Sequence, residues 1–220
     1  MTTVSPDYAV CGVCGSTVRY LVLTSTNAFG SSDLDLRPPE MQRSTMHLWV
    51  WECPNCGYTA SDISDAPSFP REFLSSPRYT SCDGLIIDDD LARRFYRQHL
   101  CAAEEGDLTQ AADALLHAAW SCDDSGDDEL AVLFRRKAVE FMDRELKELP
   151  EEKQEQRMVQ RADLLRRSRQ FSRLIDEYSA LRCREPIHRC IVSFQLMLAK
   201  RKDVRRYTVQ LACDRMGFSE

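Results

Sequence analysis

Two short cysteine motifs, Cys11-Gly12-Val13-Cys14-Gly15 and Cys53-Pro54-Asn55-Cys56-Gly57, constrain the fold of this chain more than any other feature. Two Cys-x-x-Cys turns supply four thiolates, the ligand set that holds zinc tetrahedrally in a structural site. Glycine follows each pair directly, and it can adopt the positive φ that folds the backbone around a metal-bound sulfur. We therefore predict one structural zinc ion per chain, bound by Cys11, Cys14, Cys53 and Cys56. Protein fills all four positions, which leaves none for a catalytic water.

Extended segments are expected beside both motifs. The stretch from Thr17 to Ser25 follows the first motif and is rich in β-branched and apolar residues, a composition typical of a strand. The stretch from Met46 to Glu52 alternates between two faces and runs directly into Cys53, which predicts a second strand. Two strands that lead to cysteine turns make a zinc ribbon, here within residues 1–60. Because such a ribbon has little apolar core, bound zinc would supply much of its folding free energy.

A long loop, Thr26 to Thr45, separates the two expected strands. It contains glycine and proline and has no sustained periodicity. Structureless connections longer than about 12–15 residues are uncommon unless they serve a function, so this loop is the first place to expect a ligand site. Its polar candidates are Asp33, Asp35 and Arg37. The alternative is that the aspartates form turns and the arginine forms a local salt bridge.

The remaining cysteines indicate a reducing compartment. The chain has 220 residues and ten cysteines, and we find neither a signal peptide nor a stretch of about 18 apolar residues that could span a membrane. These features favour a cytoplasmic protein without a membrane partner. Outside the two motifs we expect buried thiols at Cys82, Cys101, Cys122, Cys183, Cys190 and Cys213.

The rest of the chain is expected to be helical. Residues 61–88 contain three prolines and scattered serines, which indicates a connector with a short helix near residues 71–75. From residue 89 onward glycine and proline are sparse and apolar residues recur at helical spacing. We predict helices over residues 90–105, 108–121, 128–149, 151–168, 172–182, 186–202 and 204–213. The predicted fold is mainly α: a small β zinc ribbon followed, over residues 89–220, by antiparallel helical hairpins.

Two segments share one spacing of large and small side chains. They are Leu108, Ala111, Leu115 and Ala118, and Phe171, Leu174, Tyr178 and Leu181. This spacing resembles the second helix of a tetratricopeptide repeat, although it is also typical of ordinary helix packing. With the Cys-x-x-Cys-Gly and Cys-Pro-x-Cys-Gly-Tyr turns, the chain resembles an uncharacterised bacterial family of zinc-ribbon proteins that carry tetratricopeptide-like helices. The resemblance implies zinc binding at the four motif cysteines and implies no enzymatic activity.

Charge divides unevenly along the chain. Residues 61–150 contain 10 basic and 20 acidic residues, whereas residues 151–220 contain 16 basic and 10 acidic residues. The opposition could let successive helices pack together or could create a nucleic-acid-binding face. The aromatic candidates for such a face are His47, Trp49 and Trp51, for which packing on the first helices is the alternative. The basic candidates are Arg157, Arg161, Arg166, Arg167, Arg169, Arg173, Lys200, Arg201, Lys202, Arg205 and Arg206.

Other combinations of reactive residues are weaker. Cys183, His188 and Cys190 could contribute to a second metal site, or the cysteines could be buried thiols. The sequence has no phosphate-binding glycine loop and no serine-nucleophile motif, so an enzyme, for example one using Asp33 and Asp35, is disfavoured. We expect a non-enzymatic adaptor or scaffold that binds a protein partner through its helices or its ribbon loop. A nucleic-acid-binding module is the alternative.

Overall fold

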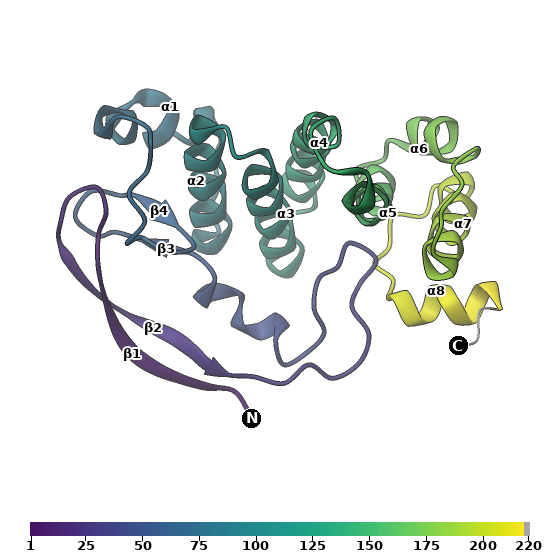
Figure 1. Ribbon diagram of the computed structural model, residues 1–220, viewed down its shortest axis with the longest axis horizontal. Helices are drawn as coiled ribbons and strands as arrows, with labels where there is room; N and C mark the ends of the chain where they lie inside the picture. Colours follow the sequence, from purple (N-terminus) through teal and green to yellow (C-terminus); the bar gives the residue numbers. More distant parts are fainter. Residues whose placement is uncertain (218–220) are drawn as a thin grey trace.

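The computed structural model describes residues 1–217 as a row of helices with two small antiparallel sheets at its N-terminal end (Figure 1). One sheet pairs β1 (Thr3–Val10) with β2 (Thr17–Ser25), and the other pairs β3 (Trp51–Glu52) with β4 (Thr59–Ala60). The short helices are η1 (Arg43–Leu48), η2 (Arg71–Ser75), α1 (Pro77–Thr80) and η3 (Cys82–Gly84). The row contains α2 (Asp90–Glu105), α3 (Leu108–Ser125), α4 (Asp128–Glu145), α5 (Glu151–Arg167), α6 (Phe171–Tyr178), α7 (Pro186–Lys200) and α8 (Val209–Met216). The predicted fold class is confirmed.

The helix boundaries follow from local chemistry. Asp89, Asp107 and Asp127 precede α2, α3 and α4, and each carboxylate accepts a hydrogen bond from the backbone N–H three residues later. Gly106 and Gly126 end α2 and α3 with φ of 81°, a left-handed conformation that glycine adopts without a steric cost. These caps turn the chain back twice within 40 residues, so that α2, α3 and α4 pack side by side.

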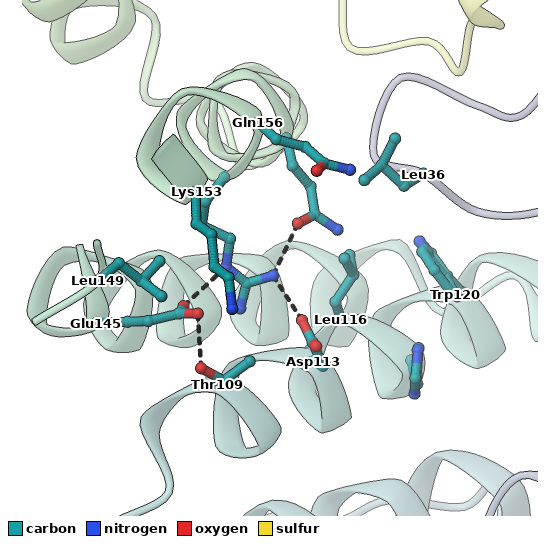
Figure 2. A pocket seen from close by; sticks show the side chains of 12 residues that line it. Leu36, Thr109, Asp113, Leu116, Trp120, Glu145, Leu149, Lys153 and Gln156 are labelled. Carbon is teal, nitrogen blue, oxygen red and sulfur yellow. Dashed lines mark hydrogen bonds and ion pairs between the residues drawn. The ribbon is translucent and has the colours of Figure 1, made fainter. Parts of the chain in front are cut away.

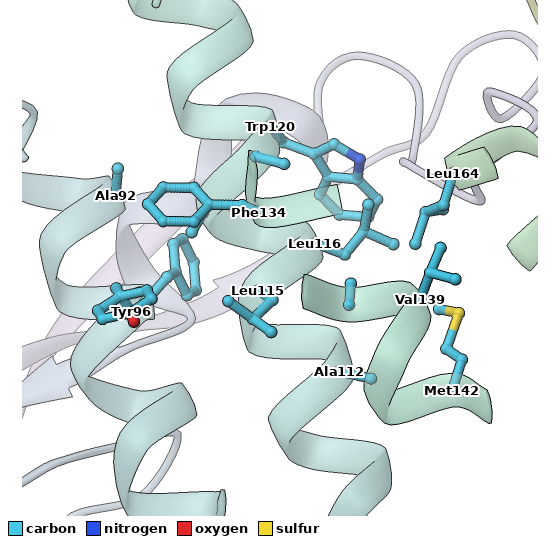
Figure 3. Close-up of a cluster of buried hydrophobic side chains, with 14 of the residues drawn as sticks. Ala92, Tyr96, Ala112, Leu115, Leu116, Trp120, Phe134, Val139, Met142 and Leu164 are labelled. Carbon is cyan, nitrogen blue, oxygen red and sulfur yellow. The ribbon is translucent and has the colours of Figure 1, made fainter. Parts of the chain in front are cut away.

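A continuous apolar core joins the helices (Figure 3). Tyr96 of α2 and Phe134 of α4 stack with their ring centroids 5.3 Å apart, and Leu115 of α3 lies beside them. Fully buried alanines, such as Ala112 on α3, let the helices approach closely. The same core includes Ala9 from the first sheet. The predicted boundaries at residues 60 and 88 stay a prediction. No helix within residues 1–217 is long and apolar enough to cross a bilayer.

The structure corrects two predicted elements and adds one that was not predicted. The strand expected over residues 46–52 is wrong: residues 43–48 form η1, and only Trp51–Glu52 are extended. Met46, Leu48 and Val50 are all buried, which gives the alternation that suggests a strand, but Thr45 beside Met46 is buried as well. The last helix begins at Val209, not at residue 204, because Thr208 caps it through the Leu211 N–H. Strand β1 was not predicted from the sequence.

The loop between β2 and η1 runs along one side of the helical row as far as α8 (Figure 1). The backbone N–H of Val209 donates to the carbonyl of Ser32 at 2.9 Å, and the N–H of Leu34 donates to the carbonyl of Tyr207 at 3.0 Å. Near the middle of the row, Gln160 of α5 donates to the carbonyl of Asp35 at 2.9 Å. Although the loop is irregular, as predicted, backbone and side-chain contacts fix its course.

Candidate metal centre and helical groove

The four motif cysteines form one compact cluster. Their Sγ atoms all lie within 4.8 Å of one another. Cys11 and Cys56 have Sγ atoms 3.7 Å apart, as do Cys14 and Cys53. Tetrahedral zinc with Zn–S bonds of about 2.3 Å places its sulfurs about 3.8 Å apart. The cluster therefore has the donor set and the spacing to hold a metal ion with all four positions filled by thiolates.

Two matching turns build this cluster. Each turn lies between paired strands, and the glycine after the second cysteine donates its N–H to the carbonyl of the first: Gly15 to Cys11 at 2.9 Å, and Gly57 to Cys53 at 2.8 Å. Both glycines have positive φ, 72° and 75°. The conformation predicted for the glycines is therefore present in both turns. The sequence did not reveal that the first turn joins β1 to β2 as a hairpin.

The thiols of the cluster differ in acidity. Burial raises the pKa of the Cys11 and Cys56 thiols. A hydrogen bond with the Asn55 side chain is the largest influence on Cys14, whose pKa falls to about 5. A dication among the sulfurs would favour the thiolate form at every ligand, including the two that burial holds neutral.

The polar loop residues are buried in ion pairs with the helices. The Asp35 carboxylate accepts a hydrogen bond from the Trp120 indole at 2.7 Å and lies 3.4 Å from the Arg167 guanidinium. Arg37 is fully buried and pairs with Asp124 of α3. The loop candidates are thus brought to the helical row, and Arg37 reaches a partner far away in the sequence. The expected local salt bridge of Arg37 is therefore wrong.

Asp33 lies at the far end of the same loop. Its carboxylate accepts a hydrogen bond from Arg43 at 2.7 Å and faces the Arg206 guanidinium at 3.7 Å. Burial raises the pKa of Asp33, and the neighbouring Asp35 adds to that effect. The structure places both aspartates among arginines: Asp35 is paired with α5, and Asp33 with η1 and with the segment between α7 and α8.

The arginines of α5 are mostly internal. Arg166 is fully buried and pairs with Asp163, while Arg161 pairs with Asp143 and Glu177. Arg157 is also buried and is shared between α3 and α4 carboxylates, Asp113 at 2.6 Å and Glu145 at 2.7 Å. The acidic side chains of residues 61–150 and the basic side chains of residues 151–220 therefore form ion pairs between helices. The basic candidates that remain exposed are Arg169, Lys200, Arg201, Lys202, Arg205 and Arg206.

The aromatic candidates pack on the protein. Trp49 contacts His117 of α3 with ring centroids 5.4 Å apart, and Trp51 contacts Tyr20 at 4.5 Å. His47 is exposed at the end of η1. The alternative of packing is confirmed for Trp49, while Trp51 packs on the hairpin.

The second cysteine and histidine group does not assemble. Within residues 1–217, the one cluster with metal-ligand spacing is the four motif cysteines. His188 instead pairs with Glu155 at 2.6 Å, and the Cys190 thiol donates to the Ala212 carbonyl at 3.4 Å. The expected buried free thiols are confirmed at all six positions outside the two motifs.

An open groove lies beside the loop, between α3 and α5 (Figure 2). This α3–α5 groove has a volume of about 570 Å³. Leu36 stands at its rim, 39% exposed and with φ of 69°, a conformation that is uncommon for branched side chains. The lining residues are Leu36, Thr109, Asp113, Leu116, His117, Trp120, Glu145, Leu149, Lys153, Gln156, Arg157 and Gln160. The sequence did not reveal this groove, because its walls come from four separate segments.

Comparisons with known proteins add no functional assignment. No family model, no curated protein and no solved structure matches this chain. Function is therefore inferred from the residues and their geometry alone.

Proposed function

We propose that this chain is a zinc-binding, non-enzymatic adaptor whose helical row binds an extended segment of another protein. One observation carries the proposal: the row already holds an irregular segment of its own chain, through the backbone contacts of Ser32, Leu34 and Asp35. Beyond Leu36 the same side of the row continues as the open α3–α5 groove. The groove offers a bound peptide four apolar residues, Leu36, Leu116, Trp120 and Leu149, among polar and charged side chains that can hydrogen-bond to it.

The turn at Leu36 supports this proposal. The N–H of Leu36 donates to the Asp33 carbonyl at 2.9 Å, and the N–H of Asp33 donates to the Arg37 carbonyl at 2.9 Å. This tight turn directs Asp35 and Arg37 into the protein and leaves Leu36 at the groove. A left-handed, exposed leucine costs about 1 kcal/mol or more. Contact with a partner in the groove would bury that side chain.

We further propose that the cluster of Cys11, Cys14, Cys53 and Cys56 holds one zinc ion with a structural role. Four thiolate donors favour zinc over harder cations, and a fully liganded ion has no open position for chemistry. Mass spectrometry of the native protein, with elemental analysis, tests this assignment. One zinc per chain supports it, and a different metal or none in protein purified with reduced thiols contradicts it.

Selection of peptides on the zinc-loaded protein tests the adaptor proposal. Random 15-residue peptides are displayed and selected, and the survivors are tested against Gln156→Trp, which adds bulk at the exposed rim of the groove. Glu152→Trp is the control, because it places the same bulk on the same helix outside the groove. Peptides that bind Gln156→Trp more weakly than the parent protein, but bind Glu152→Trp as well as the parent, support the proposal. Failure to enrich any sequence, or equal binding to both variants, contradicts it.

A second candidate function is nucleic-acid binding by the exposed basic stretch Lys200–Arg206. This stretch has five basic residues in seven positions, and α7 ends within it. Reversal of Arg201 and Arg206 to glutamate tests this candidate. Binding to single-stranded DNA that weakens steeply with salt and is lost in the double variant supports it. Binding that is insensitive to salt contradicts it.

We also propose that the chain belongs to the bacterial zinc-ribbon family with tetratricopeptide-like helices and that it is located in the cytoplasm. The four-cysteine cluster and the helical hairpins support the first. The ten free cysteines support the second, because free thiols persist in reducing compartments.

A further inference from the structure

A second cavity, distinct from the α3–α5 groove but bordering it, lies between η1, α2 and α3. This α2–α3 pocket has a volume of about 350 Å³. It shares Thr109, Asp113 and His117 with the groove. Its full lining is Trp49, Ser61, Gln98, Asp107, Thr109, Gln110, Asp113, Ala114 and His117. The pocket thus extends the side of the row on which the proposed partner would lie.

Gln98 is the most informative residue of this pocket. Only 5% of its surface is exposed, and its buried Oε1 accepts no hydrogen bond. A buried acceptor without a donor costs about 1–3 kcal/mol. Oε1 itself has almost no accessible surface, so a donor group in the pocket would satisfy it after the Gln98 side chain turns toward the cavity that it lines. Gln98 therefore points to a ligand that carries N–H or O–H groups.

The charge of the pocket is acidic. Asp107 and Asp113 are the charged residues of its lining, and lysine and arginine are absent from that lining. Asp113 already faces Arg157 from the neighbouring groove, but that guanidinium is shared with Glu145, and the Asp113 side chain is still 39% exposed. Asp107 caps α3 through one oxygen only, by accepting the Gln110 N–H at 2.9 Å. Both carboxylates therefore keep acceptor capacity toward the cavity.

The aromatic wall suits a cation. Trp49 and His117 lie in contact along one side, and burial lowers the pKa of His117 to about 4, so its ring is neutral near pH 7. A cation over an indole is stabilised by the ring quadrupole. The same helix provides an example three residues from His117, where Arg37 lies 5.8 Å from the Trp120 ring centroid and pairs with Asp124.

We propose that the α2–α3 pocket binds the guanidinium group of an arginine side chain supplied by the partner protein. A guanidinium matches the pocket better than an ammonium does, because its planar fork presents five donors to several acceptors and stacks on an aromatic face. In the bound state its N–H groups donate to Gln98 Oε1 and to the Asp113 carboxylate, and its plane rests on Trp49. This inference rests on the proposed adaptor function and names the side chain that the partner contributes.

The test uses the full zinc-loaded chain and N-acetyl-arginine amide as the probe. Titration is followed by nuclear magnetic resonance at the Trp49 indole N–H and the Gln98 side-chain amide. N-acetyl-citrulline amide is the matched probe, because it keeps the shape and removes the charge. We expect saturable shifts with the arginine probe and binding of the citrulline probe about tenfold weaker. Equal binding of the two probes, or shifts confined to other residues, overturns the proposal.

Two variants and a control locate the site. Asp113→Asn removes the charge, and Gln98→Leu removes the acceptor without breaking any existing hydrogen bond of Oε1. Each variant is expected to bind the arginine probe about tenfold more weakly than the parent protein does. Glu140→Gln, an exposed acid on α4 outside the pocket, is the control and should bind as the parent does. Loss of binding in the control as well, or retention in both variants, contradicts the assignment.

The outcomes separate this inference from the adaptor proposal. Peptides that depend on the α3–α5 groove but carry no arginine at a fixed position would leave the adaptor standing and refute the arginine pocket. Specific binding of the arginine probe without any enriched peptide would refute the adaptor and retain the pocket.

Discussion

His99 makes the stability of this fold sensitive to acid. The ring is 4% exposed, lies between Tyr96 and Phe141, and has its Nδ1 3.0 Å from the carbonyl oxygen of Ala111. Burial lowers the pKa of His99 to about 4 in the folded protein, although the hydrogen bond with the Ala111 carbonyl works in the opposite direction. In the unfolded chain the same ring titrates near 6.5. Between these values the unfolded state binds more protons, so stability is present above pH 6.5 and is lost as the pH falls.

The size of the effect follows from the two pKa values. Between pH 7 and pH 5 the proton linkage of this one ring lowers the free energy of unfolding by about 2 kcal/mol, and most of a total of about 3 kcal/mol is lost by pH 4. The charged groups that influence the ring, Lys137, Arg78 and Asp83, are minor beside burial. A loss of about 3 kcal/mol is a large fraction of the free energy of unfolding of a typical domain.

His99→Asn isolates the contribution of His99. An asparagine amide can donate to the Ala111 carbonyl from nearly the same position but does not titrate in this range. Urea unfolding of both proteins is measured at pH 7 and pH 5, with zinc in excess. Because loss of metal ligation by protonated thiols affects both proteins alike, the difference between the two pH dependences reports His99. The parent should lose about 2 kcal/mol more than the variant. Equal losses would refute the pKa argument.

Three further predictions concern the metal turns and the loop. Cys53→Ser should abolish stoichiometric zinc and unfold the ribbon while the far-ultraviolet dichroism of the helices persists; loss of all helical signal would contradict separate stabilisation. Gly12→Ala should destabilise by about 1–3 kcal/mol in urea unfolding, because a Cβ there would lie 2.7 Å from the Ala66 nitrogen, whereas Val13→Ala should cost less. Trp120→Phe removes the indole donor to buried Asp35 and should lower the melting temperature by roughly 4–8 °C, for a loss of about 2 kcal/mol. Trp51→Phe is its control, and an equal shift in both would argue against a special role for the Asp35 contact.

The elements that the sequence predicted well are those encoded by neighbours in the chain. A cysteine pair followed by glycine specifies a turn by itself, and the aspartate caps with Gly106 and Gly126 specify where helices begin and end. Helix α2 spans the residues predicted for it. Strand β1 contains Pro6 and Asp7, which are poor strand formers, and it is extended because β2 pairs with it across the first cysteine turn. No pattern within Thr3–Val10 contains that information.

The path of the loop was beyond prediction for the same reason. Asp35 contacts Trp120 and Arg167, which are 85 and 132 residues away in the chain. The sequence around a loop aspartate does not distinguish three roles: forming a turn, binding a ligand, or forming an ion pair with a distant helix. Only the fold brings Asp35 to these partners, and only the fold shows that the groove continues past Leu36.

The arrangement of charge links the fold to both proposed functions. The acidic middle third and the basic last third are opposed because Asp113, Asp123 and Asp143 pair with arginines of α4, α5 and α6. Ion pairs hold five of the six candidate arginines between residues 157 and 173, Arg157, Arg161, Arg166, Arg167 and Arg173, and a guanidinium held by a carboxylate offers little to phosphate. The acidic α2–α3 pocket and exposed Lys200, Arg201 and Lys202 keep charge to offer, whereas Arg205 pairs with Asp203 and Arg206 faces Asp33. The α2–α3 pocket shares Thr109, Asp113 and His117 with the open groove, so a partner bound in that groove, as proposed above, would also reach the acidic pocket.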